Sequence, residues 1–391
     1  MLKNDMGYTR DFLDAVLRES TQIQGLPFSI GGVCAKHGTV YEGFACNEKI
    51  CDPVDMDTII WIASMTKAVT TTAIMQLLER GALSLKQKAG SILPELLDLP
   101  VLKGYDGQGK SILAPCEGAI TVEQLLNHSS GFAYSFWNES INRYYRENGL
   151  PDTTSGSLKS LSAPLVRQPG TAWEYGISTD WLGLLLEKLT GMRLGEYLEK
   201  NILVPLNMQS TGFVIKDLKR LAPFYQLDSN NCCSRIPFIF PQNAEFHSGG
   251  AGLYSTVRDY LRFSRMLLNK GRLEGVTILR PETVALMFGE GVTGPKVRTL
   301  KGCGDSLDLR FYEDVQKSWG LCFMKNEETL PGGRSAGSQF WGGAANTYVF
   351  IDPKKELGGV FATQVLPFQN RPCEAAFARF EEAVYDSFDN F

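Results

Sequence analysis

Several absences set the first limits on what this chain can be. Its 391 residues contain no run of about 18 apolar residues, so the sequence predicts no membrane-spanning segment. Residues 1–7 carry no apolar stretch followed by small residues, as an export signal would, and we expect a cytoplasmic protein. Basic residues are scattered and the formal net charge is −4. Because phosphate binding needs a clustered basic surface, we expect no nucleic-acid partner.

The cysteines lack a regular pattern as well. Nine are present, an odd number without even spacing, which favours reduced thiols over a disulfide framework. The adjacent pair Cys232-Cys233 has no C-x-x-C or H-E-x-x-H pattern beside it. The sequence therefore predicts no metal site and implies no cofactor.

Hydrophobic periodicity predicts strands at both ends of the chain and helices between them. The strand-like runs are 28–35, 39–45, 319–324, 347–351 and 358–363, and the helix-like runs are 8–22, 65–80, 121–127, 179–190, 256–269 and 372–386. We expect an α/β sheet domain built from residues 1–62 and 250–391, with a mainly helical domain at 63–249 inserted between them. A cleft between the two domains is the natural place for an active site.

Ser64 and Lys67 form the one S-x-x-K pattern in the chain. They open a predicted amphipathic helix with the apolar stripe Val69, Ala73 and Leu77, and a spacing of three places both side chains on one helical face. A buried amine with a lowered pKa could take the proton of the hydroxyl group. The pattern alone is weak, because it arises about once by chance in a chain of this length. The alternative is a serine helix cap beside a surface lysine.

Two further segments strengthen the catalytic interpretation. Tyr175 lies just before a strongly apolar predicted helix, where a loop could project its phenol into a cleft. The segment Trp341-Gly342-Gly343 leads into a predicted strand, and paired glycines let a substrate approach the backbone closely. The N–H of the next residue, Ala344, could then donate to an oxyanion.

Together these motifs resemble the class C β-lactamase fold, and within it the family VIII carboxylesterases and the lovastatin-acyltransferase-like enzymes. The resemblance runs from about residue 10 to residue 385, and it includes the segments 125–131 and 249–256. It implies a β-lactamase- or penicillin-binding-protein-like α/β fold, with an antiparallel sheet flanked by helices and a mainly helical inserted domain.

The resemblance also implies roles for individual residues. Ser64 would be acylated, Lys67 and Tyr175 would share the general-base work, and the N–H groups of Ser64 and Ala344 would form the oxyanion hole. The loop after residue 127 is expected to overhang the nucleophile, so that Tyr134, Phe136 and Trp137 contribute to substrate binding. His247, which precedes a glycine cluster, is a further candidate at the border of the cleft.

Two departures from the β-lactamase pattern bear on the substrate. Ile177 stands where those enzymes carry an asparagine that reads an amide, and Trp341 stands where they carry a lysine that holds a carboxylate. Losing that cation removes a charge-assisted contact. We expect Trp341 to offer an apolar wall, so that the site prefers neutral or hydrophobic acyl groups and does not hydrolyse β-lactams efficiently.

A competing motif fails on its context. Residues 333–337 match G-x-S-x-G, but the nucleophile elbow needs a strand before the serine, a helix after it and a later histidine. No histidine follows Ser335, which we expect to be a turn residue. His37 and His128 lie in predicted turns, and we expect structural roles for both.

The sequence thus predicts a carboxylesterase-like serine hydrolase that acts on a small-molecule ester or acyl thioester through an acyl-enzyme. The first alternative is an acyltransferase that passes the acyl group to an alcohol or amine of a larger metabolite. The second alternative is a β-lactamase-like scaffold that binds ligands with little catalysis.

Overall fold

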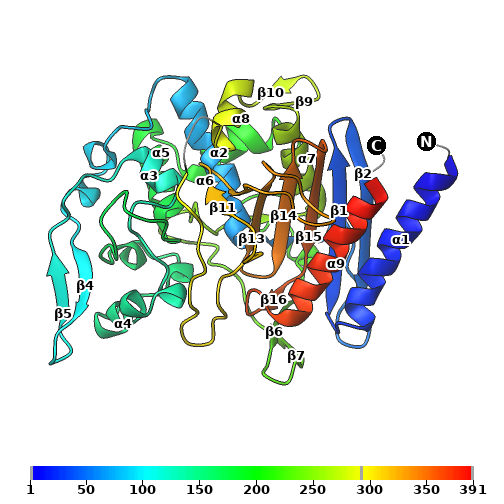
Figure 1. Cartoon of the computed structure of the whole chain (residues 1–391), viewed down its shortest axis with the longest axis horizontal. Helices are drawn as coiled ribbons and strands as arrows, with labels where there is room; N and C mark the ends of the chain where they lie inside the picture. The colour runs from blue at the N-terminus through cyan, green and yellow to red at the C-terminus, as the bar shows by residue number, and fades with distance from the viewer. Residues whose placement is uncertain (1–2, 291–293, 389–391) are drawn as a thin grey trace.

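The computed structural model describes residues 3–290 and 294–388. Its centre is a seven-stranded antiparallel sheet in the order β11-β12-β13-β14-β15-β1-β2 (Figure 1). The strands are β1 (Phe28–Ala35), β2 (Gly38–Cys46), β11 (Lys317–Trp319), β12 (Met324–Asn326), β13 (Gln339–Gly343), β14 (Thr347–Asp352) and β15 (Leu357–Ala362). The two ends of the chain meet where β1 pairs with β15. The predicted fold class, an antiparallel sheet flanked by helices, is confirmed.

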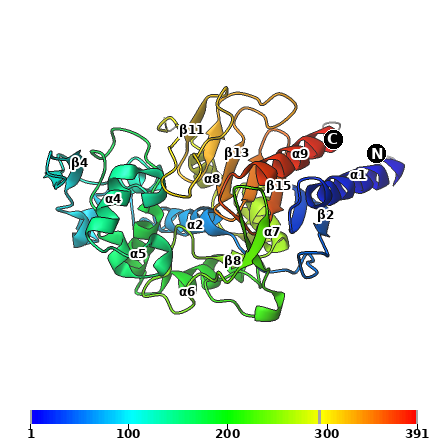
Figure 2. The same cartoon turned by 90° about the horizontal axis from the view of Figure 1, so that it is seen from below.

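Helices cover both faces of this sheet. Helices α1 (Lys3–Gln22) and α9 (Arg371–Phe388) lie side by side on one face, and α7 (Val257–Leu268) lies on the other (Figures 1 and 2). Neighbouring glycines of β1 show why both helix layers fit closely. A Cβ atom on Gly31 would lie 2.7 Å from the ring of Phe380 in α9, and one on Gly32 would lie 2.5 Å from Leu261 in α7. Successive residues of a strand point to opposite faces, so each glycine makes room for one layer.

The part of the chain between β2 and β11 holds helices and short strands joined by long loops. It contains α2 (Thr66–Glu79), α3 (Val122–Leu126), α4 (Glu139–Glu147), α5 (Ser178–Thr190), α6 (Leu194–Leu198) and α8 (Pro281–Met287). Its short strands are β3 (Ile60–Trp61), β4 (Val101–Tyr105), β5 (Ser111–Ala114), β6 (Phe224–Leu227), β7 (Cys233–Ile236), β8 (Tyr254–Ser255), β9 (Arg272–Leu273) and β10 (Val276–Thr277), and β16 (Val365–Leu366) joins β6 later. Figure 2 shows α4, α5 and α6 at the end of the molecule away from α1 and β2.

The domain boundaries at residues 62 and 250 stay a prediction. Of the described residues, none between 47 and 316 belongs to the seven-stranded sheet. The predicted sheet domain also includes residues 1, 2, 291–293 and 389–391, which lie outside the described residues. Within the described part of the chain, no helix is both long and apolar enough to cross a lipid bilayer. The described residues include all nine cysteines, and each of them is a free thiol.

Two predictions of local structure were wrong. Helix α2 is buried along almost its whole length, from Thr66 to Leu77, and it has no polar outer face as an amphipathic helix would. It packs against α5, α6 and α8, so its threonines also point into the interior. The run 319–324 is not a strand, because Trp319 and Met324 pair with each other as the ends of β11 and β12. The four residues between them form a turn buried under α8, where the N–H of Leu321 donates to the carbonyl of Met287. This burial explains the apolar sequence of the turn.

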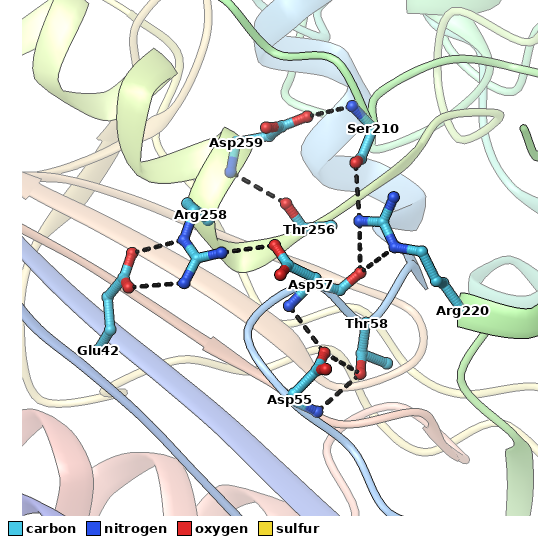
Figure 3. Close-up of polar contacts among 9 residues, drawn as sticks. All are labelled: Glu42, Asp55, Asp57, Thr58, Ser210, Arg220, Thr256, Arg258 and Asp259. Carbon is cyan, nitrogen blue, oxygen red and sulfur yellow. Dashed lines mark hydrogen bonds and ion pairs between the residues drawn. The ribbon is translucent and has the colours of Figure 1, made fainter. Parts of the chain in front are cut away.

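A polar network fixes the segment that leads to Ser64 (Figure 3). In it, the Arg258 guanidinium of α7 pairs with the carboxylates of Glu42 in β2 and Asp57. The Arg220 guanidinium donates to the Asp57 carbonyl and to the hydroxyl of Ser210. Exposed ion pairs contribute at most about 1 kcal/mol each. Their main effect is to fix the position of the loop around Asp57, which they connect to the sheet, to α7 and to the 210–220 segment. This loop leads directly into β3.

Candidate active site

Ser64 lies in a tight turn between β3 and α2. The turn covers Ala63–Met65, and Ala63 has a φ of 44°, in the left-handed region that residues other than glycine rarely adopt. Strained backbone of this kind clusters at functional sites. A Cβ atom on Gly343 would lie 2.3 Å from the Ile62 carbonyl oxygen, so only glycine lets β13 approach the turn this closely. The sequence analysis expected a substrate to lie close to the backbone of the paired glycines. In the structure, the backbone just before Ser64 takes that place beside Gly343.

The Lys67 amine lies among three oxygen atoms. Its Nζ is 3.1 Å from Ser64 Oγ, 3.0 Å from Tyr134 Oη and 2.9 Å from the Gly250 carbonyl oxygen. A neutral amine has two N–H bonds and one lone pair, and the carbonyl of Gly250 can only accept. One N–H is thereby committed to the carbonyl, which leaves one N–H and the lone pair for the two hydroxyls. The arrangement can therefore accept the proton of Ser64.

Burial changes the protonation of this amine. The Lys67 side chain is 2% exposed, and burial lowers its pKa from 10.5 to about 7, although the Asp180 carboxylate opposes the shift. A charged amine loses its hydration in the interior, so the neutral form is favoured. Near pH 7 a large fraction of Lys67 is uncharged and can act as a base.

Asp180 is a further candidate site residue that the sequence analysis missed. It lies in the first turn of α5 and is buried. Its Oδ1 accepts from the Ser248 hydroxyl at 2.6 Å and from the Gly250 N–H at 3.0 Å. Burial raises the pKa of Asp180, while the charge of Lys67 and these hydrogen bonds oppose the rise. A carboxylate within the apolar run of α5 was the signal available in the sequence.

Tyr175 stands on the other side of the nucleophile. Its Oη accepts from the Trp341 indole N–H at 2.9 Å, and its ring centroid is 4.6 Å from Lys67 Nζ. Burial raises the pKa of Tyr175 well above its ordinary value, although hydrogen bonds with Ser64 and Trp341 lower it. Tyr175 is therefore a neutral phenol, whereas Lys67 is the group that titrates near neutral pH.

Trp341 was expected to form an apolar wall of the substrate site, but it is buried beside Tyr175 instead. The ring is 2% exposed and packs edge-on against Trp319 at 4.5 Å, and it does not line the substrate-sized cavity described below. Its indole N–H serves as a hydrogen-bond donor to Tyr175. The tryptophan thus fills the position of a lysine with a neutral donor, which carries no charge to attract a carboxylate.

The two expected oxyanion donors lie on adjoining segments. Ala344 directly follows Gly343, whose close approach to Ile62 brings the end of β13 against the turn that carries Ser64. Within the described residues, neither the Ser64 N–H nor the Ala344 N–H donates a hydrogen bond to the protein. Both donors are therefore available to a substrate oxygen.

A cavity of about 360 Å³ adjoins Ala344. Five aromatic side chains line it: Trp61, Phe136, Trp137, Phe238 and Phe368. It lies next to the candidate catalytic residues, because Phe136 stacks at 4.8 Å on the Tyr134 ring and Trp137 lies 5.7 Å from the Tyr175 ring. Three larger surface hollows, of about 740, 700 and 480 Å³, are lined by other segments and contain none of the catalytic candidates.

The structure brings only some of the expected binding residues to this cavity. Phe136, Trp137 and Ala344 line it, whereas Tyr134 instead contacts the amine of Lys67. Ile177 is buried just before α5, and Gly342 faces Phe368 and Tyr348. Neither residue lines the cavity.

His247 has contacts elsewhere. Its Nδ1 accepts from the Gly195 N–H at 3.0 Å, and its ring stacks on Phe213 at 4.4 Å. His128 is buried between the rings of Tyr175 and Trp319, at 4.8 and 4.9 Å. Burial and then the charge of Lys67 lower the pKa of His128 well below its ordinary value.

The G-x-S-x-G segment does not form a nucleophile elbow. The N–H of Ser335 donates to Asp352 Oδ2 at 2.8 Å, and the residues that follow run through a turn into strand β13. An elbow would continue into a helix. Ser335 therefore belongs to the loop between β12 and β13, and it forms no hydrogen bond with Ser64 or Lys67 among the described residues.

Comparison with known proteins agrees with this geometry. A family model described as Beta-lactamase matches residues 32–383. The chain is 31% identical over 356 residues to the monacolin J acid methylbutanoyltransferase of Aspergillus terreus, which covers 87% of this chain and 84% of that protein. It is also 31% identical over 333 residues to the lovastatin esterase of Penicillium rubens, covering 81% and 82% of the two chains.

Solved structures show the same fold. The unliganded simvastatin synthase (LovD) of Aspergillus terreus matches with a TM-score of 0.81 and 26% identity, over 97% of this chain and 99% of that one. EstCE1, a hydrolase with promiscuous acyltransferase activity, matches with a TM-score of 0.75 over 98% and 99% of the chains, and its 21% identity supports the fold alone. The resemblance inferred from the sequence is confirmed. The chain therefore belongs to the β-lactamase family, and it is a serine hydrolase or acyltransferase that acts on ester bonds.

Proposed function

We propose that this protein hydrolyses small-molecule esters through an acyl-enzyme on Ser64. One observation carries the proposal: Lys67 Nζ is 3.1 Å from Ser64 Oγ, and its pKa is about 7. Efficient general bases have pKa values near the operating pH. The site thus has a nucleophile and a base of which a large fraction is unprotonated near pH 7.

The proposed reaction proceeds in two halves. Neutral Lys67 takes the proton of Ser64 as Oγ attacks the ester carbonyl, and the N–H groups of Ser64 and Ala344 stabilise the oxyanion. When the C–O bond breaks, the phenol of Tyr175 gives its proton to the leaving alcohol and regains one from protonated Lys67. Water then attacks the acyl-enzyme and Lys67 accepts its proton. Lys67 passes this proton to Ser64 Oγ as the acyl–Oγ bond breaks, so that the acid leaves and both residues return to their starting state.

The lining of the site disfavours a negatively charged acyl group and accommodates a hydrophobic one. Trp341 offers a neutral donor to Tyr175, and the adjacent cavity has aromatic walls. A carboxylate-bearing β-lactam would enter without the cation that a lysine supplies. We therefore propose slow or absent β-lactam hydrolysis.

Acyl transfer is the second candidate. The relative from Aspergillus terreus is a methylbutanoyltransferase at 31% identity, and the lovastatin esterase is equally similar. The two reactions share every step up to the acyl-enzyme and differ in whether water or an alcohol attacks it. The cavity of about 360 Å³ is large enough to hold part of an acceptor.

The proposal is tested with short-chain p-nitrophenyl esters, comparing wild type with Ser64→Ala and reading the mass of the intact protein after a rapid acid quench. We expect nitrophenol release and an acyl adduct in wild type only. Alcohols added to the reaction divide the candidates, since new ester products support transfer and unchanged hydrolysis supports the esterase. Equal behaviour of wild type and Ser64→Ala, with no adduct on either, would instead favour a binding scaffold.

A further inference from the structure

The cavity beside Ala344 has an acidic lining. Two charged residues border it, Asp152 and Asp305, and among the described residues no lysine or arginine lines it. Both carboxylates are exposed enough to keep their ordinary hydration until a substrate enters. A bound carboxylate would face two like charges with no cation to pair with it, which is unfavourable.

Both acids sit on segments that are anchored to the protein. Asp152 Oδ1 accepts from the N–H and the hydroxyl of Thr154, at 2.8 and 2.7 Å. The segment around Asp305 is tied to the aromatic wall on both sides. The Cys303 N–H donates to the Phe136 carbonyl at 3.0 Å, and the Trp137 indole N–H donates to the Leu307 carbonyl at 2.9 Å.

Aromatic rings form the rest of the wall. Trp61 and Phe238 lie 4.9 Å apart, and Phe136 and Trp137 lie 4.6 Å apart, measured between ring centroids. The faces of tryptophan and phenylalanine attract cations through the ring quadrupole, and quaternary ammonium groups are recognised by aromatic cages. Aromatic faces combined with carboxylates are a lining that favours positive charge.

We propose that this cavity receives an organic ammonium group of the substrate, and that Asp152 and Asp305 select for that charge. The inference rests on the proposed ester chemistry at Ser64 and names its substrate class. Esters that carry a cationic amine should react faster than neutral isosteres, and both should react faster than carboxylates.

The test uses two matched series of esters at low ionic strength. In the first series the charge is on the alcohol part: acetylcholine, 3,3-dimethylbutyl acetate and 3-acetoxypropanoate. In the second series it is on the acyl part: p-nitrophenyl esters of 4-(trimethylammonio)butanoate, 5,5-dimethylhexanoate and glutarate. Asp152→Asn, Asp305→Asn and the double variant are compared with wild type, and Glu117→Gln, an exposed acid that does not line the cavity, is the control. Asparagine at 152 can still accept the hydrogen bonds from Thr154.

We expect wild type to prefer the cation over the anion in at least one series, and the double variant to reduce that ratio of kcat/KM about tenfold. Added salt should also reduce the ratio, because both acids are exposed. A flat or reversed order in both series, or a ratio unchanged in the double variant, would overturn the inference while ester turnover upheld the proposed function.

Binding separates this inference from the chemistry. Choline, 3,3-dimethylbutanol and 3-hydroxypropanoate are titrated against Trp fluorescence, which Trp61 and Trp137 report from the cavity wall. If no ester is turned over but choline binds in an Asp152- and Asp305-dependent way, the proposed reaction fails and the charge selection stands. If neither binding nor turnover depends on these acids, the charge selection is wrong.

Discussion

The proposed catalytic group, which consists of Ser64, Lys67, Tyr175 and Asp180, and the cavity beside it are built in opposite ways. Lys67, Tyr175 and Asp180 are buried, and their polar atoms are held by hydrogen bonds of known direction. The cavity is walled by rings whose contacts are mostly apolar, and its two carboxylates are exposed. In the catalytic group, burial sets the protonation states, and proton transfer depends on the exact positions of a few atoms. In the cavity, substrate selection depends only on the shape and the charge of the lining. Substitutions in the catalytic group should therefore change rates greatly, and substitutions in the cavity should change selectivity by small factors.

Removing the base is expected to give the largest effect. Lys67→Met keeps an unbranched side chain, one atom shorter, and removes the amine, so kcat/KM should fall by about 10²–10⁴-fold. The melting temperature should stay the same or rise, because the variant no longer buries an amine whose charged form is disfavoured there. Ester hydrolysis and calorimetry measure both, with the exposed Lys354→Met as control. Near-normal activity in Lys67→Met would remove the lysine from the mechanism.

The indole hydrogen bond to Tyr175 should matter less. Trp341→Phe keeps an aromatic ring and removes the N–H, and kcat should fall about three- to tenfold with KM nearly unchanged. Trp319→Phe is the matched control, because the Trp319 indole N–H has no partner among the described residues. Equal losses in the two variants would show that ring packing matters and the hydrogen bond does not.

Replacing Asp180 should change the pH dependence of kcat/KM. The carboxylate raises the pKa of Lys67, so Asp180→Asn should lower that pKa below about 7. Because Lys67 works when neutral, the rise of kcat/KM with pH should move to lower pH. At pH 6 the variant should retain a roughly threefold larger fraction of its maximal rate.

The control for this shift is Asp259→Asn, a buried acid that contacts Ser210 and Thr211 and does not contact Lys67. Its profile should match that of wild type. A profile of Asp180→Asn that stays in place, or moves to higher pH, would mean that Asp180 does not act on the charge of Lys67.

A change in the cavity wall should give the smallest effect. Phe238→Ala removes one ring that faces Trp61, and KM for a hydrophobic ester should rise about two- to threefold while kcat holds. The exposed Phe44→Ala serves as control. A large fall in kcat would show that the wall also positions the reacting atoms. It would contradict the view that the cavity affects only selectivity.

The same division explains what the sequence could predict. The motifs around Ser64, Tyr175 and Trp341 are short but local, so the sequence shows them, and the antiparallel sheet flanked by helices followed from the family resemblance that they carry. The cavity draws on segments far apart in the chain, among them Trp61, Phe238 and Phe368, and no local pattern joins them. The role of Trp341 as a donor depends on its distance to a residue 166 positions away, which periodicity does not contain. Helix α2 was predicted to be amphipathic from its apolar stripe, but burial places its threonines inside as well.

The most direct test of the account is the rate of Ser64 acylation as a function of pH, measured by rapid quench and intact mass spectrometry with a p-nitrophenyl ester. The account predicts an adduct absent from Ser64→Ala, with a rate that rises through a midpoint near pH 7, where Lys67 loses its proton. An adduct on another residue, or a midpoint above pH 9, would contradict the claim that a buried, uncharged Lys67 activates Ser64.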